Sequence, residues 1–123
     1  MGLEAYSRGA EVTWVERDPA VVKVIRHNLS HLGAQGRVHA MDVRRFLSGK
    51  PASYDIVWLD PPYEMASTTV EDFLALLDSG WLTESGIVLV ERSSRSSEVE
   101  FPRGFRDVGQ RRYGDTTIHH GKR

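Results

Sequence analysis

One apolar run that ends in two prolines constrains the fold of this chain more than any other feature. Residues 54–59 read Tyr-Asp-Ile-Val-Trp-Leu, and Asp60, Pro61 and Pro62 follow at once. A nearly continuous apolar stretch is typical of a parallel strand that is covered on both faces. The prolines end the strand because they have no backbone donor for a ladder. Parallel strands need long crossover connections, so the run predicts an α/β fold.

Helix-like and strand-like segments alternate along the rest of the chain, as an α/β fold requires. Asp18 and Pro19 predict a helix start, with an N-cap followed by proline at the first helical position. Further strands are expected at residues 12–15, 37–41, 86–90, 105–112 and 116–120, and further helices at residues 3–8, 43–47 and 69–77. We therefore expect one partial domain over residues 1–123, a three-layer sandwich with a mostly parallel sheet and an antiparallel last strand.

The composition of the chain excludes several classes of protein. Its 123 residues include no cysteine, so a disulfide framework and a thiolate metal site are excluded. No apolar run approaches the roughly 20 residues that span a bilayer, and the N-terminus lacks the pattern of a secretory signal. We expect a cytoplasmic protein with no membrane partner.

Charge is unevenly distributed, although the net charge is only −1. Residues 1–91 carry a net charge of −5 and residues 92–123 carry +4. The basic end contains Arg92, Arg95, Arg111 and Arg112. These side chains are expected either to contact nucleic-acid phosphate or to be solvated loop residues.

Acidic side chains follow three of the expected strands, at Glu16, Asp42 and Asp60. Ligands of open α/β sheets bind at the carboxyl ends of the strands, so these positions are candidate site residues. Glu16 can hold a ribose diol, or it can be a surface charge beside the next helix. Asp42 can accept from an adenine amine, or it can cap the helix that follows.

The Asp60-Pro61-Pro62-Tyr63 loop is the most specific candidate site. Two prolines make the loop stiff and leave its carbonyls free to accept hydrogen bonds. Together, the Asp60 carboxylate, these carbonyls and the flat Tyr63 ring suit an exocyclic amine on a base, which they would hold and stack upon. Such a grip orients the nitrogen lone pair toward an electrophile. A rigid turn with a capping aspartate is the structural alternative.

The order of these segments resembles one family. The matching segments are residues 2–10 (Gly-Leu-Glu-Ala-Tyr-Ser-Arg-Gly-Ala), Glu16, Asp42, the Asp-Pro-Pro-Tyr loop and residues 113–116 (Tyr-Gly-Asp-Thr). The chain resembles the RsmD-type methyltransferases over nearly its whole length. That family methylates the N2 amine of a guanine in small-subunit ribosomal RNA, using S-adenosylmethionine on a Rossmann-like class I methyltransferase fold.

The resemblance assigns roles to the candidate residues. Glu16 would bind the cofactor ribose and Asp42 the adenine, and we place Arg17, Val43 and Asp60 in the same cofactor-binding set. In catalysis, Asp60 and the Pro61 carbonyl would hold the guanine amine within the rigid loop formed with Pro62, and Tyr63 would stack on the base. The implied partner is ribosomal RNA or the small ribosomal subunit particle, and no metal is implied.

The chain also departs from the family. Members carry a strand and a glycine-rich cofactor loop just before the segment that matches Gly2, and this sequence shows neither. We therefore expect an N-terminally truncated domain whose unpaired sheet edges permit self-association. By this hypothesis the 123 residues alone bind S-adenosylmethionine poorly, and micromolar binding in a calorimetric titration would refute it.

Other functions remain as alternatives. The loop suits any exocyclic amine, so a DNA or RNA adenine-N6 methyltransferase is one alternative, and a non-catalytic truncated domain is another. A nicotinamide-binding domain is disfavoured because the sequence has no Gly-x-Gly-x-x-Gly. His27 and His31 are expected on an exposed helix face rather than in a metal site.

Overall fold

The computed structural model describes residues 12–33, 36–62, 64–96 and 99–123. The chain divides into two compact units, residues 1–49 and residues 50–123, and each is described by itself. The expected helix at residues 3–8 lies outside the described residues, as does the predicted stacking residue Tyr63. The interpretation of residues 1–123 as one domain stays a prediction. Within the described part of the chain, no helix has both the length and the apolar character to cross a membrane.

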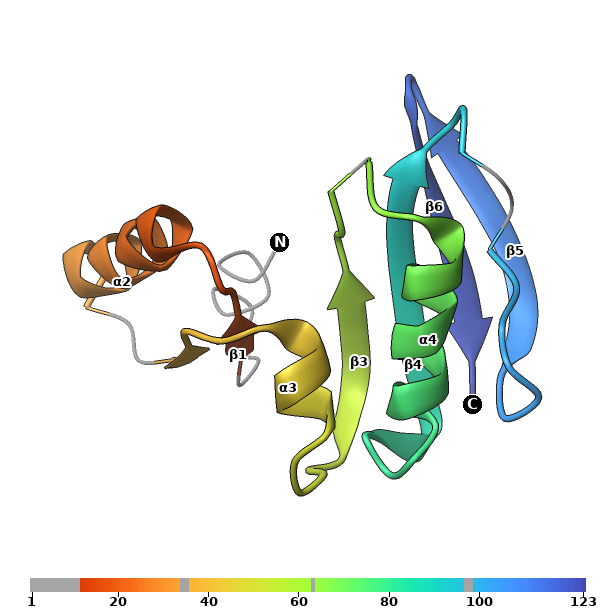
Figure 1. Ribbon diagram of the computed structural model, residues 1–123, viewed down its shortest axis with the longest axis horizontal. Helices are drawn as coiled ribbons and strands as arrows, with labels where there is room; N and C mark the ends of the chain where they lie inside the picture. The colour runs from red at the N-terminus through yellow and green to blue at the C-terminus, as the bar shows by residue number, and fades with distance from the viewer. Residues whose placement is uncertain (1–11, 34–35, 63, 97–98) are drawn as a thin grey trace. The chain divides into compact units, whose positions relative to one another are not determined.

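The described part of the first unit contains two short parallel strands and two helices. Its elements are β1 (Thr13–Val15), α2 (Pro19–His31), β2 (Arg37–His39) and α3 (Val43–Leu47), labelled in Figure 1. Asp18 caps α2 as predicted, because its Oδ1 accepts from the Ala20 backbone N–H at 2.9 Å and Pro19 follows it. His27 and His31 are exposed on α2 with their rings stacked, which confirms the exposed helix face.

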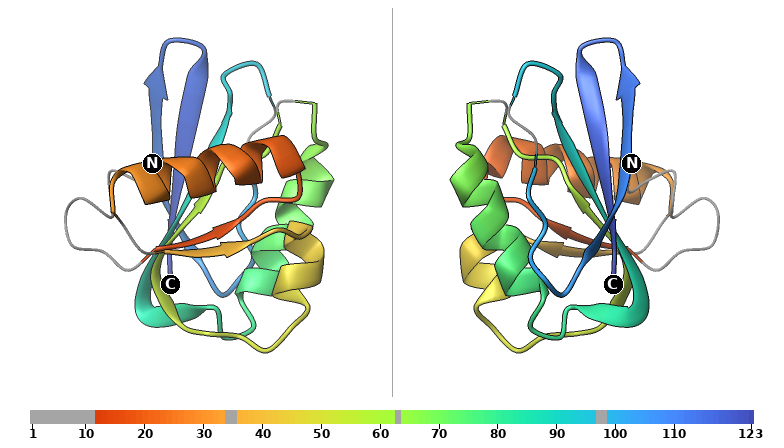
Figure 2. Two further views of the ribbon diagram at one scale, coloured as in Figure 1. Left: turned by 90° about the vertical axis from the view of Figure 1, so that its left-hand side faces the viewer. Right: turned by 90° about the vertical axis from the view of Figure 1, so that its right-hand side faces the viewer.

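In its described residues, the second unit is a four-stranded mixed sheet with one helix. Its elements are β3 (Tyr54–Leu59), α4 (Ser67–Leu77), β4 (Leu82–Ser93), β5 (Arg106–Tyr113) and β6 (Thr116–Lys122). The strand order is β3-β4-β6-β5, with β3 and β4 parallel and the other neighbours antiparallel. The predicted antiparallel last strand is confirmed. α4 lies on one side of this sheet in the views of Figures 1 and 2.

The core of the second unit lies on one face of its sheet. Burial alternates along β4, where Val88 and Val90 are fully buried and Ile87, Leu89 and Glu91 are only half-buried. This period of two is that of a strand with one covered face. The buried apolar residues of the unit are Val70, Phe73, Leu74, Leu77, Trp81, Leu82, Val88, Val90, Val99 and Phe105.

Strand β3 is less covered than its sequence predicts. None of its six residues is buried, and the Ile56 side chain is 61% exposed. The physical reason is that β3 is the edge strand of its sheet, with β4 as its one described neighbour. The expectation of a strand covered on both faces is therefore wrong for the described residues, although the predicted limits of the strand are confirmed.

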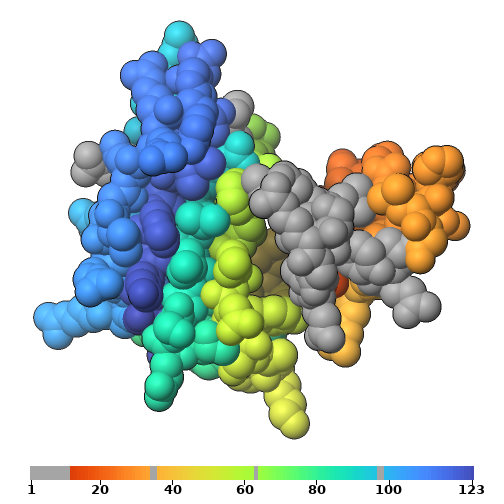
Figure 3. Space-filling view, turned by 180° about the vertical axis from the view of Figure 1, so that it is seen from behind, coloured from red at the N-terminus to blue at the C-terminus, as the bar shows by residue number. Residues whose placement is uncertain are grey.

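Strands β5 and β6 form a hairpin joined by Gly114 and Asp115, as predicted. Gly114 has φ of +60°, a left-handed value that glycine adopts without a steric cost at the first position of a tight hairpin turn. All eight residues of β5 are exposed. In Figure 3 the hairpin, in blue, stands out at one end of the second unit.

Candidate functional site

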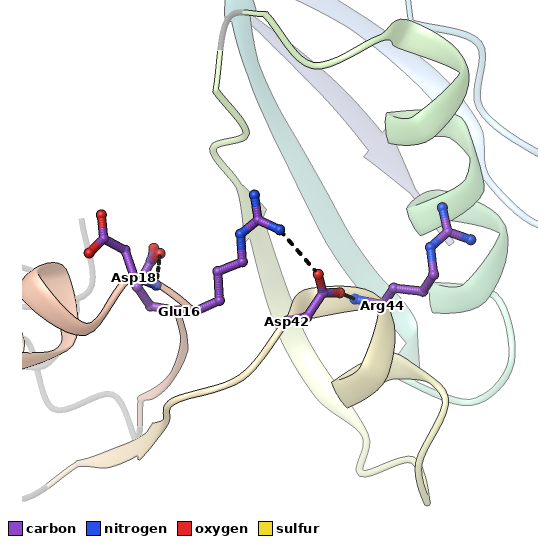
Figure 4. A network of polar contacts seen from close by, with 5 residues as sticks. Glu16, Asp18, Asp42 and Arg44 are labelled. Carbon is purple, nitrogen blue, oxygen red and sulfur yellow. Dashed lines mark hydrogen bonds and ion pairs between the residues drawn. The ribbon is translucent and has the colours of Figure 1, made fainter.

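In the first unit, the predicted acidic residues Glu16 and Asp42 lie at the same edge of the β1–β2 pair. The Glu16 backbone N–H donates to the His39 carbonyl at 3.0 Å, which continues the parallel ladder beyond β1. Arg17 then links the two strand ends, because its Nη1 lies 3.6 Å from Asp42 Oδ2 (Figure 4). Carboxyl ends of neighbouring parallel strands meet at one edge, which explains why distant residues come together here.

The carboxylates of Glu16 and Asp42 also bind their own backbone. Glu16 Oε1 accepts from the Asp18 N–H at 3.0 Å, and Asp42 Oδ1 accepts from the Arg44 N–H at 2.7 Å (Figure 4). The capping interpretation of Asp42 is therefore confirmed, and α3 begins with the half-buried Val43 directly after it. In the described part of the first unit, Glu16 Oε2 receives no hydrogen bond.

In the second unit, Asp60 lies directly beyond β3, where the sequence predicts it. Trp58 and Asp60 are two residues apart, so their side chains leave the same face of the strand. Trp58 pairs with Leu89 of β4, which places Glu91, two residues after Leu89, on that face as well. The Trp58 indole Nε1–H donates to Glu91 Oε2 at 3.4 Å. Glu91 is thus held beside Asp60 by a neighbouring ring.

Burial and the neighbouring Glu91 both make Asp60 a weaker acid. Partial burial raises the pKa of the Asp60 carboxyl above its usual value, and the charge of Glu91 and a side-chain hydrogen bond with it raise the pKa further. Ionised Asp60 presents only acceptor oxygens to an amine, whereas protonated Asp60 also presents a donor. Activity that depends on Asp60 as an acceptor should therefore fall on the acid side of the pH range.

Glu91→Gln is expected to shift that acid limb toward lower pH. The substitution removes the negative charge beside Asp60 and so lowers the Asp60 pKa, while the amide oxygen can still accept from Trp58. A pH–rate profile of the methyl transfer that the family resemblance implies would measure the shift. Thr83→Val is the control, since it removes a side-chain bond to the exposed Asp55 of β3 and should leave the profile in place. An unchanged acid limb in Glu91→Gln would show that the two carboxylates are not coupled.

Arg92 is a correction to the sequence analysis, which expected it either to contact nucleic-acid phosphate or to be a solvated loop residue. Arg92 as a residue is only 2% exposed, so it is not a surface contact. Nη1 donates to the Pro62 carbonyl at 3.3 Å and Nη2 donates to the Met65 carbonyl at 2.7 Å. Its Nε has no hydrogen-bond partner among the described residues. Arg92 therefore fixes the loop that follows Asp60.

The bonds of Arg92 leave the start of the loop free. Met65 N–H donates to the Pro62 carbonyl at 3.0 Å, so this carbonyl closes a turn and also accepts from Arg92. The carbonyl of the half-buried Pro61 accepts no bond from the described residues. Asp60 and the Pro61 carbonyl are thus two acceptors at the end of β3, held in place by the rest of the loop.

The roles of Glu91 and Arg92 were missed by the sequence analysis, although one signal was present. In Val88-x-Val90-x-Arg92 the period of two predicts that Arg92 shares the covered face, while Glu91 lies on the opposite face. The remaining basic candidates lie where the sequence predicts, since Arg95, Arg111 and Arg112 are all exposed.

Comparisons with known proteins agree with this architecture. The family model described as "Conserved hypothetical protein 95" matches residues 1–122. The chain is 38% identical over 103 residues to the ribosomal RNA small subunit methyltransferase D of Escherichia coli strain K12, covering 81% of this chain. Among solved structures, a "putative methyltransferase" of Escherichia coli aligns with a TM-score of 0.84 and 29% identity over 99% of this chain and 68% of its own. A "putative methylase" of Haemophilus influenzae aligns with a TM-score of 0.82 and 26% identity, over 98% of this chain and 78% of its own.

The match to the curated relative covers 48% of that protein, so the chain spans about half its length. The fold shared with the solved structures is the Rossmann-like class I methyltransferase fold that the sequence predicts. With a family match over residues 1–122, this chain belongs to the Conserved hypothetical protein 95 family, the family of the RsmD-type methyltransferases.

Proposed function

We propose that this protein transfers a methyl group from S-adenosylmethionine to the exocyclic N2 amine of a guanine in small-subunit ribosomal RNA. The observation that carries the proposal is the pair of acceptors formed by Asp60 and the Pro61 carbonyl, fixed at a strand end by Arg92. The curated relative is named as a methyltransferase of small-subunit ribosomal RNA, which supports RNA as the substrate class.

The proposed role of the loop is to hold and activate a poor nucleophile. The lone pair of a guanine amine is delocalised into the ring, which makes the nitrogen weakly nucleophilic. Two acceptors on its hydrogens favour a pyramidal nitrogen whose lone pair points out of the ring plane, and this orientation brings the amine closer to the reactive geometry. Ionised Asp60 also stabilises the positive charge that develops on nitrogen, and Tyr63 would stack on the base.

Of the two acidic residues proposed to bind the methyl donor, Glu16 has a carboxylate oxygen available, whereas both oxygens of Asp42 already have partners. S-adenosylmethionine, when bound, supplies an electrophilic methyl group on sulfur. Glu16 Oε2 is available for a ribose hydroxyl, whereas both oxygens of Asp42 are engaged, one by the Arg44 N–H and one by Arg17. The Arg17 side chain is 74% exposed, so its ion pair with Asp42 is worth only about 0–1 kcal/mol and can yield to an adenine amine.

The class of nucleic acid that receives the methyl group tests this proposal. Tritiated methyl groups should pass from S-adenosylmethionine to small-subunit ribosomal RNA or to the assembled small subunit particle, and not to duplex DNA. Label in DNA would favour the adenine-N6 alternative, because the same loop can hold the adenine amine. Absence of label in every acceptor, together with absence of cofactor binding, would favour a non-catalytic domain. A ribosomal substrate would place the protein in the cytoplasm.

A further inference from the structure

The tip of the β5–β6 hairpin lies at the same end of the second unit's sheet as the Asp60 loop. In the strand register Ser93, near the carboxyl end of β4, pairs with Thr116, and Thr116 pairs with Tyr113. The turn is tied to β4, since the Ser94 N–H donates to the Asp115 carbonyl at 2.8 Å. Figure 1 shows the turn of the hairpin and the segment after β3 at the same end.

Four exposed residues lie at this end of the sheet, and we call them the tip cluster: Arg95, Arg111, Arg112 and Tyr113. Tyr113 is 55% exposed, so the face of its ring is accessible to a ligand. Arg111 Nη1 donates to the Tyr113 hydroxyl at 3.4 Å, so the two side chains lie together. Arg112 Nε donates to the Gly114 carbonyl at 2.9 Å, which directs its guanidinium toward the turn.

The strand register relates the tip cluster to the candidate catalytic loop. Arg92, which holds the loop, pairs with Thr117, and Thr117 pairs with Arg112. Two strand spacings therefore separate Arg92 from Arg112, a distance of about 10 Å. Glu91 and Arg111 both pair with Ile118, so Arg111 and Tyr113 share the sheet face of the Glu91–Trp58 pair.

We propose that the tip cluster is an RNA-docking surface, which binds the strand next to the target base. Arg111 and Arg112 would bind phosphates through paired N–H donors, Arg95 would add a third cation, and Tyr113 would stack on one unpaired base. Positive charge beside an exposed ring complements single-stranded RNA, and this proposal rests on the proposed function for RNA as the substrate class. It adds Tyr113, which the sequence analysis did not assign to RNA.

Salt-dependent RNA binding tests the role of the two hairpin arginines. Arg111→Gln/Arg112→Gln is expected to make the slope of log affinity against log salt shallower by about 1.4, as measured by anisotropy of a short fluorescein-labelled single-stranded RNA. Arg103→Gln/Arg106→Gln is the matched control, because Arg106 begins β5 at the end away from the turn, Arg103 lies three residues before it, and both are exposed and carry the same charge. An unchanged slope in the tip variant, or an equal loss in both variants, would overturn the proposal.

Tyr113 provides a second and independent test. Tyr113→Ala is expected to weaken RNA binding roughly tenfold, whereas Tyr113→Phe keeps the ring and should bind nearly as well as the parent protein. Equal affinity in all three proteins would contradict stacking. RNA binding and methyl transfer are measured separately, so the two proposals can fail independently. If the tip variants lose RNA binding but the parent protein forms no guanine-N2 product, the proposed function alone is refuted. If the parent protein forms that product and the tip variants bind RNA as well as it does, the docking surface alone is refuted.

Discussion

In the full-length enzyme, Asp60→Ala is expected to lower the rate of methyl transfer by roughly 10²- to 10³-fold, while the affinity for S-adenosylmethionine stays within a few-fold. The substitution removes the charged acceptor at the end of β3, so the amine loses both its orientation and the stabilisation of its developing charge. Single-turnover transfer of a tritiated methyl group measures the rate, and calorimetric titration measures cofactor affinity.

Two further variants sharpen this test of Asp60. Asp60→Asn keeps the shape and one acceptor oxygen but loses the charge, so its rate should lie between those of Asp60→Ala and the parent protein. Asp55→Ala removes a carboxylate from the exposed part of β3, where it accepts from Thr83 at 3.2 Å, and should leave transfer unchanged. Near-normal turnover in Asp60→Ala would show that the loop does not act through this carboxylate.

Arg92→Met has the second largest expected effect, a fall of about 10²-fold in the rate of transfer. A displacement of about 1 Å in a positioned group is enough for such a loss. Methionine fills a similar volume but cannot donate to the Pro62 and Met65 carbonyls, so the loop loses its anchor on β4. The free energy of unfolding should also fall by about 1–3 kcal/mol, because the Met65 carbonyl loses a charge-assisted bond.

Comparing the rate of transfer with the stability of the fold shows whether Arg92→Met acts through the position of the loop or through unfolding. If Arg92 positions the loop, the rate should fall at a temperature where circular dichroism shows a folded protein, and Arg92→Lys should recover part of it by reaching one carbonyl. Arg103→Met, at an exposed position, is the control for loss of an arginine. Full activity in a folded Arg92→Met protein would mean that the prolines and the turn at Pro62 hold the loop without Arg92.

Local signals in the sequence predicted most of the fold. The strand at residues 54–59 was placed with its observed limits because an apolar run is ended by Asp-Pro-Pro, and α2 starts at Pro19 because Asp18 caps it. The β5–β6 hairpin followed from its Gly-Asp turn. These features depend on backbone conformation within a few residues, which the sequence specifies directly.

Features that depend on which face or edge a residue occupies were harder to predict. Residues 86–90 predicted only the central part of β4, which runs from Leu82 to Ser93. Arg92 falls in the extended part, and this explains why it was expected on the surface rather than on the buried face. The exposure of Ile56 likewise follows from the edge position of β3, which local sequence does not reveal.

The identity of the methylated nucleoside tests the central claim most directly. Small-subunit RNA treated with the protein and isotopically labelled S-adenosylmethionine is digested to nucleosides, which are separated and identified by mass spectrometry. The account predicts label in N2-methylguanosine, and its loss when Asp60→Ala replaces the parent protein. Label in N6-methyladenosine or in a base without an exocyclic amine would contradict the proposal that Asp60 and the Pro61 carbonyl bind the guanine amine.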